Sequence, residues 1–175
     1  SFSTQFSPIE LLPCLFPNQY YSVNMHGKPE IYCGMITTVL LPLFYMNKEI
    51  KWNKKVGYSF LVAVLFFSMY IKPADMMWHG GQTPNWLPYR YSFLMSFVLV
   101  SMAVMTFSKL EGLKLTIGKI AGVFIGILAL VMYFDAKMPS FNYVKKGNIV
   151  YVDTVMTFVF GMILAGIYLV GLFFI

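Results

Sequence analysis

Five long apolar runs without a charged residue constrain this chain more than any other feature. They cover residues 31–47, 56–71, 91–108, 120–134 and 154–175. Because a helix rises about 1.5 Å per residue and the hydrocarbon layer of a membrane is about 30 Å thick, about 20 residues cross it, and flanking lysines extend shorter runs. Hydrophobic residues make up 58% of the chain and charged residues 11%, which is typical of polytopic membrane proteins.

We therefore predict an all-α fold, a polytopic transmembrane helix bundle over residues 31–175. The expected spans are residues 31–47, 56–71, 90–108, 117–134 and 153–175, with a polar loop at 72–89 between the second and third. Residues 1–30 are expected to be a loop outside the membrane with a short interfacial helix that opens at Ser7-Pro8 and is limited by Pro13.

The ends of the sequence indicate a segment of a longer polypeptide. Residues 1–30 lack the basic start and apolar core of a signal peptide, the chain begins with Ser1, and it stops inside an apolar run. We expect an internal fragment whose partners include the remainder of the same protein.

The lysines predict the orientation. Four of them crowd the loop 47–55, and Lys109, Lys114 and Lys119 fall on the same side, so that side is expected to be cytoplasmic. The N-terminus and the loop 72–89 are then external, and the C-terminus is cytoplasmic. The net charge of +6 suggests anionic membrane lipid as the counterion, because no pattern that reads nucleic acid surrounds these lysines.

Three small patterns add detail to the bundle. Gly118, Gly122 and Gly126 recur every four residues and predict a face on which another helix packs closely. Cys14 and Cys33 are compatible with a disulfide, and two unpaired thiols are the alternative. We predict no metal site and no evident cofactor, because the two histidines are far apart and no Cys-x-x-Cys pair occurs; a need for a divalent metal stays open.

The polar loop 72–89 is where we expect binding chemistry. Its aromatic residues fit an interfacial belt, but its polar residues, held between glycines and prolines, indicate a folded binding loop. Arg90 follows at the start of a span, where a helix N-terminus and a guanidinium both favour phosphate. A snorkelling anchor, or a partner for Asp75, is the alternative role for Arg90. The candidate substrate-binding residues are Arg90, His79, Lys72, Gln82, Asn85, Trp86 and Tyr89.

The catalytic residue is not identified by the sequence. Asp75 and Asp153 are weak candidates for a base, since both are expected outside the membrane and Asp153 heads an apolar helix.

Several short motifs resemble the YfhO family of bacterial membrane proteins in their order and spacing. They are Phe6-Ser7-Pro8, Leu11-Leu12, Pro29-Glu30-Ile31-Tyr32-Cys33-Gly34, Asn47-Lys48, Trp78-His79-Gly80, Pro84-Asn85-Trp86 and Tyr89-Arg90-Tyr91-Ser92-Phe93.

The resemblance implies part of a large glycosyltransferase of the GT-C architecture in the cell membrane of a Gram-positive bacterium. Such an enzyme moves a sugar from an undecaprenyl-phosphate-linked (polyprenyl) donor to lipoteichoic or wall teichoic acid in the cell envelope. It also implies that the catalytic acid lies in an earlier loop, outside this sequence. Two alternatives stay open, a membrane transporter or permease and a structural segment that only packs helices.

Overall fold

The structure, a computed structural model, describes residues 3–17, 28–83, 89–137 and 154–175. In this part of the chain the regular structure is helical, which confirms the predicted all-α class. The helices are α1 (Met35–Met46), α2 (Trp52–Tyr70), α3 (Lys72–Trp78), α4 (Ser92–Phe107), α5 (Ile117–Lys137) and α6 (Thr154–Phe173), with single 3-10 turns at Pro8–Leu11, Pro13–Leu15 and Glu111–Leu113.

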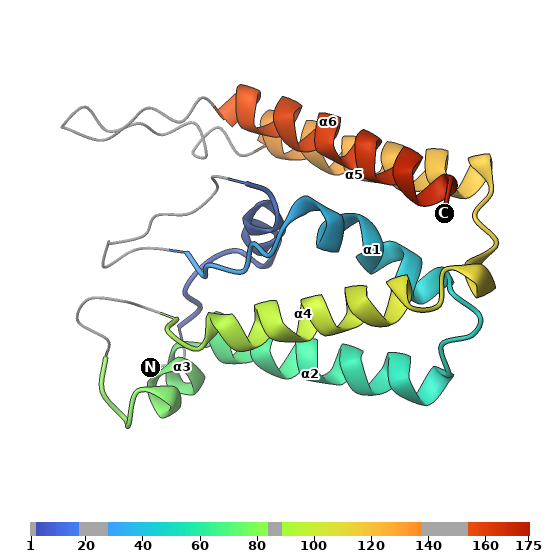
Figure 1. Cartoon of the computed structure of the whole chain (residues 1–175). Coiled ribbons are helices and arrows are strands. Elements are labelled where there is room, and N and C mark those ends of the chain that lie inside the picture. Colours follow the sequence, from blue (N-terminus) through green and yellow to red (C-terminus); the bar gives the residue numbers. More distant parts are fainter. Residues whose placement is uncertain (1–2, 18–27, 84–88, 138–153) are drawn as a thin grey trace.

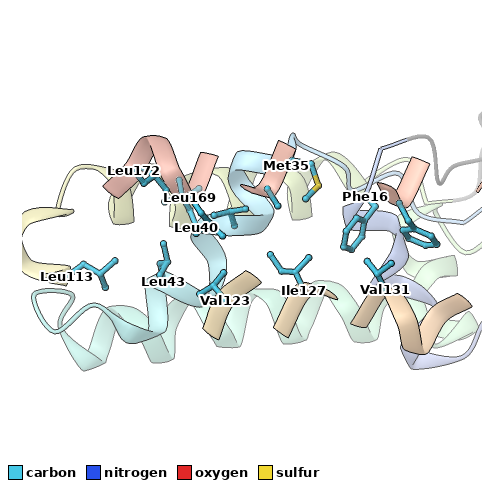
Figure 2. Packing of buried hydrophobic residues seen from close by; sticks show 14 of the residues in the cluster. Phe16, Met35, Leu40, Leu43, Leu113, Val123, Ile127, Val131, Leu169 and Leu172 are labelled. Carbon is cyan, nitrogen blue, oxygen red and sulfur yellow. The ribbon is translucent and has the colours of Figure 1, made fainter. Parts of the chain in front are cut away.

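Helix α1 lies at the centre of the arrangement, between the α2–α4 pair and the α5–α6 pair (Figure 1). Its Met35, Leu40 and Leu43 belong to an apolar cluster with residues of α5 and α6 (Figure 2). Phe44, on the same helix, belongs to a second cluster shared with α2 and α4. Both clusters bury side chains of α1, so this helix joins the two pairs.

Helix α1 begins later than the predicted span, because the backbone conformation at one residue is not helical although the apolar run continues through it. Helix α1 begins at Met35 and not at residue 31, because Gly34 has φ 97°, a value that ends any helical continuation from its N-terminal side. Among the described residues, one helix, α5, is long and apolar enough to cross a membrane. Its qualifying stretch, Ile117–Phe134, matches the predicted span 117–134. Met35–Met46, Ser92–Phe107 and Phe158–Phe173 are apolar but shorter. The number of five spans stays a prediction.

The first half of the predicted loop 72–89 is helical, so that part of the prediction is wrong. Pro73 stands in the first turn of α3, where its missing N–H is not needed, and Asp75 places a negative charge at the same helix end. A break at Ile71 separates α3 from α2. The N-terminal segment lies against this break, and Thr4 forms an isolated bridge with Ile71.

The N-terminal segment is held in the bundle by Phe16. The predicted short helix appears as the two 3-10 turns, and Pro13 starts the second one. Phe16 follows with 2% exposure and makes an edge-to-face contact with Phe158 of α6, at 5.5 Å between ring centroids. Cys14 and Cys33 are free thiols in the structure.

The glycine stripe of α5 does not pack against a helix in the described part of the chain, contrary to the prediction. A Cβ atom placed on Gly118, Gly122 or Gly126 would meet no atom within 4 Å. These glycines instead line an apolar groove of about 640 Å³ whose other wall includes Leu41 and Pro42 of α1. Helix α5 packs on α1 and α6 through a neighbouring stripe that contains Val123, Ile127 and Val131.

Candidate functional site

The C-terminal end of α3 positions His79. The N–H of Gly81 bonds the carbonyl of Met76 at 2.8 Å, and the N–H of Gly80 bonds that of Met77 at 3.4 Å. This is the Schellman arrangement, which needs a left-handed residue after the helix, and Gly80 supplies it with φ 65°. The pair Gly80-Gly81 therefore caps α3 and holds His79 at its end.

Asp75 is the buried centre of the site, with 1% exposure. The Tyr91 hydroxyl donates to the Asp75 Oδ1 at 2.9 Å and lies 2.8 Å from the carbonyl oxygen of Ser68. The His79 Nδ1 lies 3.6 Å from the same carboxylate oxygen and 2.9 Å from the Asp75 main-chain oxygen. These contacts join the end of α2, the helix α3 and the start of α4 at one carboxylate.

Arg90 is not a partner of Asp75 in the structure. The ion pairs between described residues join Asp75 with His79 and Glu10 with Lys28, and neither includes Arg90. The Arg90 side chain is exposed at the residue before the N-cap of α4. A guanidinium in this place is available to an anion from solution.

Tyr89 is buried and hydrogen-bonded to the N-terminal segment. Its hydroxyl donates to the Gln5 Oε1 at 3.1 Å, and its backbone has φ 61°, which is uncommon outside glycine. Gln5 in turn donates from its side chain to the Met69 carbonyl oxygen at 3.2 Å. Burial, and then the negative charge of Asp75, raises the pKa of Tyr89, so its hydroxyl keeps the proton that it donates.

A cavity of about 490 Å³ opens beside this network, and we call it the His79 cavity. Its lining residues belong to α3, the turn after it and the start of α4, which lie at the end of the bundle opposite the connection between α1 and α2 (Figure 1). The Trp78 indole stacks on the Tyr91 ring with centroids 4.7 Å apart and remains 48% exposed. The lining residues are Trp78, His79, Gln82, Thr83, Arg90, Tyr91 and Phe93.

The structure brings three of the predicted substrate-binding residues, His79, Gln82 and Arg90, to this cavity. Lys72 and Tyr89 do not line it: the Lys72 side chain is exposed, and its main-chain N–H bonds the Ser3 carbonyl oxygen. Asn85, Trp86 and Asp153 lie outside the described residues. Sequence reasoning gave the aromatic residues of the loop 72–89, Trp78 among them, a belt role, and it did not place Tyr91, Gln5 or Ser68 in the site, because nothing in the sequence signals contacts between these distant segments.

The comparisons with known proteins assign the chain to a family. The model of the family described as bacterial membrane protein YfhO matches residues 1–175. The chain belongs to the YfhO family. No curated protein and no solved structure matches it.

The described part of this YfhO family chain offers a divalent metal few ligands. It contains no group of three or more His, Cys, Asp or Glu side chains able to hold a metal ion. The chemistry that the His79 cavity offers is that of a cation, an imidazole, an amide and an exposed indole face.

Proposed function

We propose that this segment forms the donor-binding part of a membrane glycosyltransferase acting on the external face of a bacterial cell membrane. The donor is a sugar linked to undecaprenyl phosphate, and the acceptor is a cell-envelope polymer such as teichoic acid. The observation that carries the proposal is the His79 cavity, where Arg90, Gln82 and an exposed face of Trp78 meet. Membership of the YfhO family supports a role in a bacterial membrane.

The cavity has the groups that a glycosyl phosphate requires. The Arg90 guanidinium can hold two phosphate oxygens, and the N-terminus of α4 adds favourable partial charge next to it. The Gln82 amide can bond sugar hydroxyls, and a sugar ring can lie on the indole of Trp78. When the bond between sugar and phosphate breaks, negative charge collects on the phosphate, and a cation fixed there lowers the barrier.

The charge distribution supports an external cavity. Lys48 and Lys51 lie in the connection between α1 and α2, and Lys109 and Lys114 lie in the connection between α4 and α5. Both connections are at the end of the bundle opposite α3 (Figure 1). Because lysines are retained on the cytoplasmic side, the His79 cavity faces outward, where an acceptor polymer is reached.

The test is sugar transfer by the full-length protein in membranes, with Arg90→Ala compared with wild type at equal protein level. Loss of an electrostatic contact to a departing phosphate lowers kcat by about 100-fold or more. Lys72→Ala is the matched control, since it removes an exposed cation at the same end that does not line the cavity, and we expect it to keep wild-type transfer. Undiminished transfer by Arg90→Ala would show that the donor phosphate does not bind in this cavity. If wild type transferred sugar from no polyprenyl donor, the proposed glycosyltransferase activity would be refuted.

A further inference from the structure

The apolar groove between α1 and α5 is separate from the His79 cavity. Its volume is about 640 Å³, and the two share no lining residue. Along α5 the groove extends from Gly118 to Phe134, which at about 1.5 Å per residue is a length of about 24 Å. Leu15 and Thr38 line it near the start of α1.

The dimensions of the groove suit a single hydrocarbon chain. A volume of about 640 Å³ spread over about 24 Å leaves a width of about 6 Å. A helix with its side chains is about 10–12 Å across and does not fit, whereas carbon atoms pack about 3.5–4.0 Å apart, so one chain does. A chain in one leaflet crosses about half of the hydrocarbon layer, about 15 Å, and the groove is long enough to receive it.

The walls of the groove ask for no polar partner along most of its length. Apart from Thr38, Thr116 and Lys119, the described lining residues are apolar side chains or glycines. The Thr38 hydroxyl already donates to the Leu15 carbonyl oxygen at 2.9 Å, and the Thr116 hydroxyl lies 3.4 Å from the Lys119 N–H. An apolar chain in the groove therefore gains close packing and leaves no polar group unsatisfied.

The charge at one end of the groove is positive. Among the described lining residues Lys119, in the first turn of α5, carries the one charge. Its Nζ donates to the carbonyl oxygens of Leu113 and Lys114, which hold the ammonium against the connection between α4 and α5. An ammonium has three N–H groups, so these two contacts leave one for an acceptor from outside.

Other lysines surround this end of the bundle. The connections α1–α2 and α4–α5 meet here (Figure 1), and with the first turns of α2 and α5 they contain seven lysines and two glutamates. The lysines are Lys48, Lys51, Lys54, Lys55, Lys109, Lys114 and Lys119, and the glutamates are Glu49 and Glu111. This excess of positive charge favours an anionic headgroup over a zwitterionic one.

We infer that the groove binds one acyl chain of an anionic phospholipid whose phosphate lies beside Lys119. The second chain of the lipid stays in the surrounding bilayer. The ligand is not the sugar donor, because the donor phosphate is proposed at Arg90, at the opposite end of the bundle. The inference therefore does not depend on the proposed glycosyl transfer.

The first experiment locates the acyl chain. The full-length protein is placed in phosphatidylcholine vesicles that contain phosphatidylglycerol with a photoreactive diazirine in one acyl chain, and mass spectrometry maps the label after irradiation. We expect label on the wall peptides 38–46 and 118–134. Gly122→Leu fills the groove, since a Cβ atom there would meet no atom within 4 Å, and this label is then lost. Gly171→Leu is the matched control, because its Cβ is equally open and it does not line the groove.

The second experiment tests the headgroup. The full-length protein is offered equal amounts of phosphatidylglycerol and phosphatidylcholine, and native mass spectrometry measures the ratio of the two lipids bound. We expect Lys119→Gln to lower this ratio by about 5-fold, the effect of one basic residue near a headgroup. Lys54→Gln removes an exposed lysine at the same end that does not line the groove, and we expect it to change the ratio by less than about 2-fold.

Three results would overturn the inference. Wild-type wall peptides without label would mean that another part of the protein covers the groove. Equal label in wild type and Gly122→Leu would mean that the chain binds elsewhere. Equal effects of Lys119→Gln and Lys54→Gln would mean a diffuse attraction of the whole surface, and this comparison holds whether or not Gly122→Leu folds.

Discussion

Tyr91→Phe tests whether the buried carboxylate of Asp75 depends on one hydroxyl. The change keeps the ring, and with it the stacking on Trp78, but it removes the donor that lies 2.9 Å from the Asp75 Oδ1. Among the described residues, the carboxylate then keeps the contact with the His79 ring at 3.6 Å, and the Ser68 carbonyl loses its contact at 2.8 Å. A hydrogen bond to a charged group contributes about 1.5–3 kcal/mol, so we expect a loss of about 2 kcal/mol in the free energy of unfolding.

The assay for Tyr91→Phe is thermal unfolding of the purified full-length protein in detergent. A loss of about 2 kcal/mol corresponds to a fall in Tm of about 5 °C for a folding unit of this size. Tyr45→Phe is the matched control, because its hydroxyl is 2.8 Å from the Ser59 hydroxyl in an exposed pair that includes no buried charge. Equal Tm values for Tyr91→Phe and wild type would refute the reasoning that this hydroxyl stabilises the site.

Two further predictions concern the opposite end of the bundle and the N-terminal segment. Asn47 is fully buried and bonds the Lys109 carbonyl oxygen at 2.8 Å and the Glu49 N–H at 2.9 Å, so Asn47→Ala is expected to cost about 2 kcal/mol or more, measured by the same thermal assay; an unchanged Tm would contradict it. Burial raises the pKa of Cys14 to about 12, so iodoacetamide at about pH 8.5 is expected to label Cys14 only after unfolding, as followed by mass spectrometry of its peptide. Because this pKa is raised, the thiol's contribution to stability is complete below its ordinary value of 9.0 and is lost as pH rises above it. Labelling of native Cys14 at the rate of a free thiol would contradict its burial.

The positions of the helices follow from apolar runs, but their ends do not. The predicted span 117–134 agrees with the apolar window Ile117–Phe134, because Ile117 begins the long helix α5. Residues 31–34 are also apolar or small, yet they precede α1, and Ile31 is 2% exposed without being helical. An apolar side chain can be buried whether its backbone is helical or extended, so the apolar run alone does not locate the helix start.

The location of the site could be predicted from the sequence, but the contacts between its side chains could not. The spacing of Asp75 and His79, four residues apart, puts both on one helix face, provided that 72–78 is read as helix and not as a loop. The contacts of Tyr91 with Ser68 and of Tyr89 with Gln5 join segments 23 and 84 residues apart. Such pairs depend on how the elements meet in space, which a single sequence does not state.

The buried carboxylate explains why the site is built from several segments. A charge at Asp75 with 1% exposure is costly unless it is paired and hydrogen-bonded, and α3 alone is too short to supply the partners. The start of α4 provides Tyr91, and the N-terminal segment forms a bridge at Ile71, between α2 and α3. The carboxylate is therefore satisfied only when these segments are assembled around it. The same assembly brings Arg90 and His79 to one cavity, so the site forms only when this end of the bundle packs.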